Sequence, residues 1–185
     1  MRSALVAAAV LAPLVLASCQ APRTVPNYVS DTDSLLALRA LKGKTAQLGA
    51  FESSLKDNLQ VACRGMGPMT LQNGQTFFGY VHDAFQKEMN AAGVLSSGSP
   101  TVLTGRLESM DFGWGLIGQG DARWAMTVVL RSSNGKTMRI SSETSFHGGL
   151  NATAFCQNAP AQFMKNVQTL VKKSVSSPEF AGLFE

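Results

Sequence analysis

The sequence predicts an α+β fold, a two-layer sandwich in which a mostly antiparallel sheet of about five strands carries two main helices on one face. Apolar residues recur at steps of three and four over residues 75–92 and again between Pro160 and Pro178, as in amphipathic helices. Between these stretches, residues 101–112 and 124–146 alternate between apolar and polar side chains, as half-buried strands do. Consecutive strands joined by short turns favour antiparallel pairing, which leaves the helices to cover one face.

The first elements of the domain are predicted from shorter patterns. Asp33 and Ser34 are good helix-capping residues, several leucines follow them, and Gly43 would end the helix, although a strand fits this stretch nearly as well. Residues 45–53 alternate and predict a first strand, and residues 58–64 predict a second.

Residues 75–92 carry the clearest helical pattern, and Gly93 follows at the position of a C-terminal cap. His82 lies beside the apolar stripe of this helix. We interpret it as a surface or flanking histidine, because the sequence offers no partner for a catalytic base there. The stripe consists of Phe78, Val81, Phe85, Met89 and Ala92.

Glycines mark two positions around the third predicted strand. Gly105 lies within the strand and indicates a bulge or a close backbone approach. Residues 113–120 interleave glycines with Trp114, Leu116 and Ile117, in a spacing that fits no phosphate-binding motif. This segment is either a hairpin turn whose apolar residues fold back onto the sheet, or an adaptable contact loop for a partner protein or the lipid surface.

The last two predicted strands form a hairpin whose register follows from burial. A three-residue loop over 133–135 sets Leu130 opposite Met138, both apolar. A two-residue loop would set Leu130 opposite Arg139 and mix the two faces of the sheet. We therefore expect the longer loop, with Gly135 in the left-handed conformation.

The C-terminal segment is predicted to be helical. The helical region opens at Phe155, and Pro160 suits the first turn of its main segment because a proline there needs no N–H partner. Pro178 ends the helix, and Phe180 and Leu183 can then pack back onto the domain.

The N-terminus has the pattern of a bacterial lipoprotein signal peptide. Arg2 supplies a positive charge, and residues 4–16 form an apolar run that is too short to span a bilayer as a helix, which takes about 20 residues. The run ends in Leu-Ala-Ser-Cys, a lipobox whose cysteine, Cys19, would be lipidated after cleavage. A plain signal peptidase cut is the main alternative. We expect a signal peptide over 1–18, a flexible tether over 19–33 and one globular domain over 34–185.

Lipidation of Cys19 leaves Cys63 and Cys156 as an even pair in an oxidising compartment. A disulfide between them is therefore favoured over two buried thiols. It would close a loop of 156 − 63 = 93 residues and stabilise the domain by roughly 4 to 5 kcal/mol. No metal site is expected, because His82 and His147 lie in no ligand-spaced motif.

The charge of the mature chain argues against nucleic acid as a partner. Removal of Arg2 with the signal peptide leaves 15 Lys and Arg against 12 Asp and Glu, a net charge of +3. The basic residues are scattered rather than clustered, whereas a nucleic-acid surface needs a basic patch.

Residues 58–184 contain a succession of short motifs: Cys63-Arg64-Gly65 with Pro68, the helix from Tyr80 to Gly93, Leu103-Thr104-Gly105 with Leu107, Trp124, Ser132-Ser133-Asn134-Gly135, Phe155-Cys156, Val167-Gln168 with Leu170, and Pro178-Glu179-Phe180. This succession resembles a group of uncharacterised proteobacterial lipoproteins, in which both cysteines recur in these contexts. More loosely, the layout is similar to small outer-membrane lipoproteins of the LPS-assembly and ABC-transport auxiliary types. Those proteins pack two helices against an antiparallel sheet and act as adaptors rather than enzymes.

Together these patterns predict a non-enzymatic envelope lipoprotein, held by the lipid on Cys19, with no cofactor. Gln20 favours the periplasmic face of the outer membrane, since Asp at that position resembles an inner-membrane retention signal. We expect the domain to bind a partner protein or to support an envelope assembly or transport complex. The candidate contacts are Trp114, Leu116 and Ile117 and the exposed side of the sheet.

The alternative function is binding of a small apolar or lipidic ligand between sheet and helices. Core packing is the commoner use of the residues that would line such a pocket. An enzyme is the third possibility, and no spacing in the sequence sets a nucleophile beside a base. The residues that could line the pocket are Met66, Met69, Phe77, Phe78, Met89, Met110 and Met126.

Overall fold

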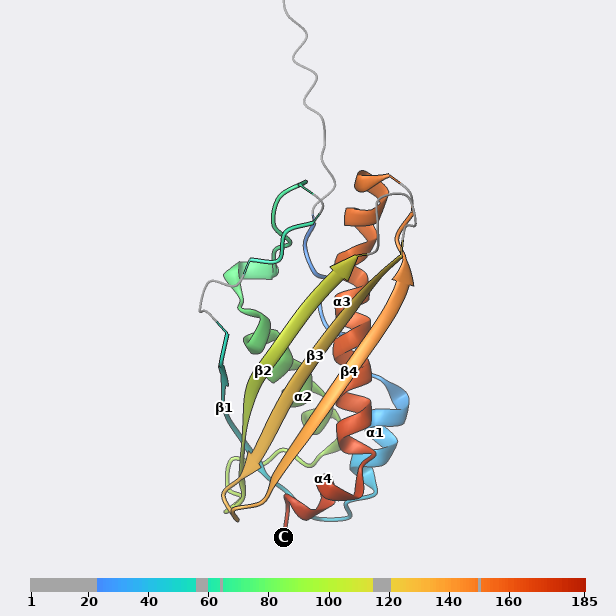
Figure 1. Ribbon diagram of the computed structural model, residues 1–185. Helices are drawn as coiled ribbons and strands as arrows, with labels where there is room; N and C mark the ends of the chain where they lie inside the picture. The colour runs from blue at the N-terminus through green and yellow to red at the C-terminus, as the bar shows by residue number, and fades with distance from the viewer. Residues whose placement is uncertain (1–22, 56–59, 64, 115–120, 150) are drawn as a thin grey trace, which may run out of the picture.

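The computed structural model describes residues 23–55, 60–63, 65–114, 121–149 and 151–185. It confirms the predicted α+β class, with helices packed on one face of a mostly antiparallel sheet (Figure 1). The predicted signal peptide, Cys19, Leu116 and Ile117 lie outside the described residues. The elements are α1 (Thr32–Arg39), β1 (Gln47–Ser53), the 3-10 turn η1 (Gln72–Gly74), α2 (Phe77–Ala92), β2 (Val102–Trp114), β3 (Asp121–Ser132), β4 (Thr137–His147), α3 (Ala152–Val175) and α4 (Pro178–Gly182).

The sheet has four strands in the order β1-β2-β3-β4, one fewer than the approximate number predicted. β2, β3 and β4 pair antiparallel, and β1 pairs parallel with β2. The predicted second strand is wrong for the part of 58–64 that the structure describes, where Ala62 makes only a single bridge to Pro68. The backbone turns back there through Gly65 and Gly67, both at positive φ, so it cannot run on as a strand.

The helices α2 and α3 lie behind the sheet in the view of Figure 1 and enclose the core with it. Trp124 of β3 is fully buried at the centre of this layer, and its indole Nε1 donates a hydrogen bond of 2.9 Å to the carbonyl oxygen of Ala159 in α3. This bond satisfies the one polar atom of the largest core side chain. No helix in the described ranges is long and apolar enough to cross a membrane.

The helix ends follow their capping residues. Thr76 caps α2 by accepting a hydrogen bond from the Gly79 N–H, and Gly93 closes the helix in the left-handed conformation, as predicted. α1 is a helix rather than a strand, and its cap is Asp31, which accepts from the Ser34 N–H, instead of Asp33 or Ser34.

The β3–β4 hairpin has the predicted register. Leu130 lies opposite Met138 and Val128 opposite Ile140, and the loop contains residues 133–135. Gly135 has a φ of +89°, in the left-handed region.

The predicted helix start at the C-terminal side is wrong by several residues. α3 begins at Ala152 under an Asn151 cap, so Pro160 lies inside the helix and not in its first turn. Phe155 and Cys156 are 0% and 1% exposed, and their burial stabilises the helical turns that precede Pro160. After α3, α4 packs back onto the domain through Phe180, as expected.

The predicted tether is wrong for the residues of 19–33 that the structure describes. Val25 is 1% and Tyr28 6% exposed, and the Val25 N–H donates to the Thr70 carbonyl oxygen at 2.8 Å. The Tyr28 hydroxyl donates to the buried Glu88 of α2 at 2.9 Å. These two apolar side chains, three residues apart, hold the segment on the domain, although prolines and polar residues surround them.

Cys63 and Cys156 form a disulfide, with their Cα atoms 5.7 Å apart. The bond joins Cys63, which lies just before a turn, to the first turns of α3. The predicted pairing is thereby confirmed.

Candidate binding surfaces

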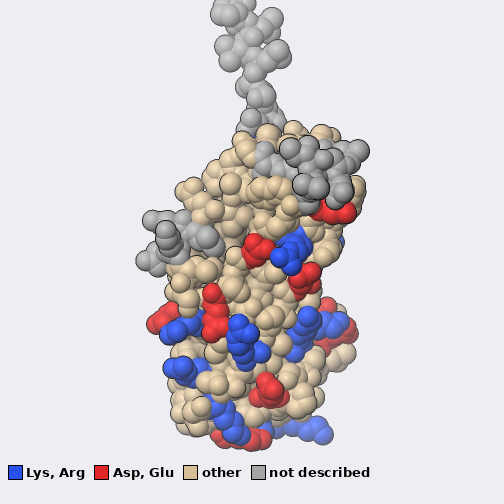
Figure 2. Space-filling view, in the orientation of Figure 1, with Lys and Arg blue, Asp and Glu red and all other residues tan. Residues whose placement is uncertain are grey.

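None of the described helices packs on the other side of the sheet, and we call that side the outer face (Figure 1). Figure 2 shows this face, with positive and negative side chains intermixed over its middle and lower part. Its charged residues come from all four strands and nearly balance in sign. They are Arg106, Arg123, Arg131 and Arg139, with Glu52, Glu108, Asp111, Asp121 and Glu143.

Ion pairs across neighbouring strands order several of these charges. The Arg123 guanidinium bridges β2 and β4, with Nη2 3.2 Å from Asp111 Oδ2 and Nη1 3.2 Å from Glu143 Oε2. Further along the sheet, Arg139 Nε lies 2.7 Å from Glu108 Oε2. All are at least one third exposed, so water and salt screen them and each contributes little to stability.

Small side chains occupy the centre of the outer face, between the two sets of ion pairs. The hydroxyls of Thr127 and Ser141 lie 2.9 Å apart, and Ala125 follows on the same side of β3. Next to them is a hollow of about 260 Å³ whose wall includes Arg106 and Arg131. A centre of low charge within a charged rim is the anatomy of many protein–protein interfaces.

A second surface lies where β2 and β4 end and β3 and α3 begin. We call it the Trp114 end and define it by Phe112, Trp114, Ala122, Phe146 and Phe155. The Phe112 ring lies 5.6 Å from that of Trp114 and 6.1 Å from that of Phe155, and the Phe146 and Phe155 rings are 5.9 Å apart. The series continues into the core, since Phe112 lies 4.4 Å from Trp124.

Trp114 is the predicted contact residue that the structure places. It ends β2, pairs with Ala122 and is 46% exposed. A hollow of about 760 Å³ beside it is also lined by Phe146 and Arg123. Leu116 and Ile117, predicted to act with Trp114, lie outside the described residues.

Both histidines lie beside carboxylates. His82 Nδ1 is 2.8 Å from Asp83 Oδ1, and the ring lies 5.4 Å from that of Phe51, so it flanks the apolar stripe as predicted. His147 Nδ1 is 2.9 Å from Asp121 Oδ1 at the Trp114 end. In the described part of the chain, no group of three or more His, Cys, Asp or Glu side chains could hold a metal ion.

Most of the residues proposed for an apolar ligand pocket belong to the core. Met69, Phe77, Met89 and Met126 are 0–6% exposed and pack in one cluster. The hollows described above lie on the outer face and at the Trp114 end, outside that cluster. Core packing therefore accounts for these four side chains.

Sequence reasoning missed one polar site. Glu88 of α2 is fully buried, and its Oε1 accepts from the Tyr28 hydroxyl at 2.9 Å and from the Asp31 N–H at 2.7 Å. Burial, and then the neighbouring Glu88 carboxylate, raise the pKa of Tyr28 above its usual value. The site fastens the N-terminal segment to α2. The only sequence signal for it is that Glu88 adjoins the apolar stripe.

The fold is similar to that of a crystallised protein from Xanthomonas campestris of the family designated DUF330. That likeness has a TM-score of 0.50 and 12% sequence identity, and it covers 75% of this chain and 85% of that chain. A Caulobacter crescentus protein named a “putative lipoprotein” aligns with a TM-score of 0.38 and 13% identity, covering 76% of this chain and 88% of that chain. No protein-family model and no curated protein matches the sequence. The first likeness shows a shared fold, whereas the resemblance to LPS-assembly and ABC-transport auxiliary lipoproteins stays a prediction.

Proposed function

We propose that this chain is a non-enzymatic envelope lipoprotein, anchored by a lipid on Cys19, that binds a partner protein through its outer face. The partner would belong to an envelope assembly or transport complex at the outer membrane. The observation that carries the proposal is the outer face itself, a sheet surface of nearly balanced charge on which none of the described helices packs, with a centre of small side chains.

The mixture of positive and negative charges on the outer face indicates which class of partner it suits. Four arginines lie among five carboxylates on the outer face, so it presents no single-sign field for nucleic acid or for a polyanion. Intermixed charges instead favour a surface with complementary charges at matching positions, which gives specificity more than affinity.

Binding also suits the described titratable groups better than catalysis does. His82 and His147 each lie beside an exposed carboxylate, and in the described residues neither is hydrogen-bonded to a serine, threonine or cysteine that could act as a nucleophile. Contacts of this kind order a surface without activating a group on it.

The anchor is tested by metabolic labelling with an alkyne fatty acid in the native bacterium. We expect label on the wild type and none on Cys19→Ala, which should leave the membrane fraction. Equal labelling of both proteins, or membrane retention of the variant, would refute the anchor.

The partner surface is tested by photocrosslinking in cells from position 129, on the outer face. Arg131→Glu reverses a charge beside that position without breaking an ion pair, since Arg131 makes none within the described ranges. Lys165→Glu makes the same charge change on the exposed side of α3 and is the matched control. We expect one discrete adduct, lost in Arg131→Glu and retained in Lys165→Glu. An adduct insensitive to both changes would contradict binding through the outer face.

A further inference from the structure

We propose that the Trp114 end rests in the interfacial layer of the membrane that holds Cys19, with the Trp114 indole among the lipid headgroups. This inference rests on the proposed lipidation of Cys19. Three observations support it: where the N-terminal segment leaves the domain, how charge is distributed, and where the exposed tryptophan lies.

The N-terminal segment is fixed to the domain at the Trp114 end. Thr24 pairs with Thr70, and the Thr70 N–H donates to the Arg23 carbonyl oxygen at 3.1 Å. Cys63 lies shortly before Thr70 in the sequence, and its disulfide to Cys156 ties this part of the chain to the start of α3. Figure 1 agrees, since the described chain begins, in blue, beside the first turns of α3 and the end of β2.

The link from this end to the lipid is short. Cys19 and Arg23 are 23 − 19 = 4 residues apart, and four residues span at most about 14 Å even when fully extended. A lipid on Cys19 therefore holds the Trp114 end close to the headgroups. Thirteen residues of β2 rise roughly 43 Å, so the opposite end of the sheet stands far from the same membrane.

Two of the chain segments at this end carry no charged side chain, while Arg23 and Asp121 lie beside them. No Asp, Glu, Lys or Arg occurs from Gly65 to Thr76 or from Thr144 to Met164. In Figure 2 the charged side chains gather over the middle and lower part of the face. Asp121, the exposed carboxylate beside Trp114, is paired with His147. An end with few charges loses little hydration energy on approaching a headgroup layer.

Trp114 supplies the contact itself. Among the described residues the exposed large apolar side chains are Val29, Leu36 and Trp114, and only the last is aromatic. Tryptophan favours the membrane interface because its ring is largely apolar while its N–H can bind water or a headgroup. The Phe112 ring behind it, 5.6 Å away, is half-buried and supports the indole.

This orientation makes the sheet stand upright on the membrane. The outer face then lies along the side of the molecule and stays open to a partner embedded in, or attached to, the same membrane. The two surfaces thus have separate roles, one toward lipid and one toward protein.

The test uses the full-length lipidated protein, purified from membranes and reconstituted in vesicles of phosphatidylethanolamine and phosphatidylglycerol with or without brominated acyl chains. Bromine quenches tryptophan emission only at short range. The chain has two tryptophans, and Trp124 is fully buried, so the signal lost in Trp114→Phe reports position 114. The matched control places Leu36→Trp in the Trp114→Phe background, because Leu36 is 59% exposed in α1, near the opposite end.

We expect brominated lipid to remove most of the Trp114 emission and to leave the emission of L36W and Trp124 nearly unchanged. Equal quenching at positions 36 and 114, or none at 114, overturns the proposal. A blue shift of Trp114 that depends on protein concentration in detergent, without quenching in vesicles, identifies a second copy as the occupant and also overturns it.

Flotation of the same vesicles separates the two possible failures. Protein that floats with the vesicles without quenching at position 114 refutes only the membrane contact of the Trp114 end. Protein that does not float refutes the Cys19 anchor of the proposed function, and the orientation with it.

Discussion

At the scale of single residues, buried polar and glycine positions decide how the N-terminal segment and the sheet are held. Glu88 of α2 holds the N-terminal segment, because its Oε1 accepts hydrogen bonds from both the Tyr28 hydroxyl and the Asp31 N–H. Its Oε2 has no hydrogen-bond partner within the described part of the chain. A carboxylate in a helix normally indicates a solvated face, which is why sequence reasoning assigned no role to it.

Removal of the Glu88 carboxylate should loosen the N-terminal segment. Glu88→Ala leaves the Tyr28 hydroxyl and the Asp31 N–H without their acceptor, at a cost of about 1–3 kcal/mol in the free energy of unfolding. Glu88→Gln keeps an acceptor oxygen and should lose less. Urea denaturation measures both variants, and limited proteolysis should cleave near Tyr28 faster in Glu88→Ala. Equal losses in the two variants would show that the hydrogen bonds are not responsible.

Tyr28 predicts how stability changes at alkaline pH. Its pKa in the folded state is raised above the usual value of 10.0, first by burial and then by Glu88. A raised folded pKa means that its contribution to stability is complete below pH 10 and is lost as the pH rises above that value. Tyr28→Phe should therefore show a shallower decline between pH 9.5 and 11 than the wild type, in urea titrations. Parallel declines would contradict this assignment.

Gly105 should tolerate no side chain. A Cβ there would lie 2.5 Å from a ring carbon of Phe51, closer than real contacts allow. Gly105→Ala should destabilise the domain by about 1–3 kcal/mol, and Phe51→Leu in the same chain should restore part of the loss. Gly98→Ala, whose new atom would meet nothing nearer than 4.0 Å, is the control and should be nearly neutral. Thermal unfolding of five proteins decides the matter: the wild type, Gly105→Ala, Phe51→Leu, the double variant and Gly98→Ala. Additive effects of the substitutions at 51 and 105 would count against the clash.

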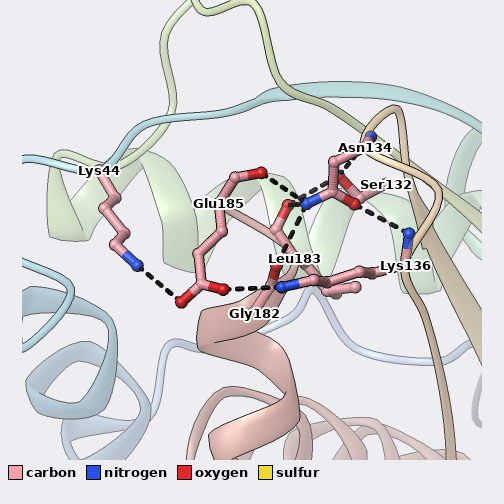
Figure 3. Close-up of polar contacts among 7 residues, drawn as sticks. All are labelled: Lys44, Ser132, Asn134, Lys136, Gly182, Leu183 and Glu185. Carbon is pink, nitrogen blue, oxygen red and sulfur yellow. Dashed lines mark hydrogen bonds and ion pairs between the residues drawn. The ribbon is translucent and has the colours of Figure 1, made fainter.

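At the scale of elements, the β3–β4 hairpin also holds the C-terminus. The Asn134 side-chain Nδ2 donates to the carbonyl oxygens of Gly182, Leu183 and Glu185, and its Oδ1 accepts from the Lys136 N–H (Figure 3). The Glu185 carboxylate lies 2.7 Å from Lys136 Nζ, which holds the pKa of Glu185 below its usual value. One turn residue thus joins the sheet to the helical layer.

Asn134→Ala should release α4 while leaving the hairpin register intact. The loss of hydrogen bonds to the last carbonyl groups predicts about 1–2 kcal/mol less stability. Hydrogen exchange should rise in residues 180–185 and stay unchanged at the Leu130–Met138 pair. Glu185→Gln removes only exposed ion pairs and should have almost no effect. Faster exchange across β3 and β4 would mean that Asn134 also sets the register.

Sequence patterns predicted the structure correctly where the burial of apolar side chains alone determines it. The hairpin register came out correctly because only one loop length keeps Leu130 and Met138 on the same face. The predictions for the described part of 58–64 and for the start of α3 were wrong for a common reason. The disulfide joins these two segments, and such a long-range constraint overrides the local preference of Pro160 and of the alternating residues.

At the scale of the whole molecule, the lipobox indicates which end of the domain would lie nearest the membrane only once the fold is known. Trp114 was identified from its glycine-rich surroundings, but its position beside the departing N-terminal segment depends on contacts between residues far apart in sequence. The outer face was foreseeable as the polar side of the alternating strands. Its ion pairs were not, because the bulge between Leu107 and Ser109 sets which side chains of β2 oppose β3.

The Cys63–Cys156 disulfide should stabilise the whole domain and the Trp114 end in particular. Its loop of 93 residues corresponds to about 4.7 kcal/mol on the chain-entropy model. Cys63→Ser with Cys156→Ser, or reduction of the wild type, should therefore lower the free energy of unfolding by about 4–5 kcal/mol in urea titrations. The released turn also carries the bridge to Thr24, so the double variant should expose the N-terminal segment to proteolysis before the sheet unfolds. Reductant should not change the double variant further. If stability falls while protection of residues 23–31 stays at its wild-type level, the Glu88 site alone holds that segment, and the disulfide acts only through the unfolded chain.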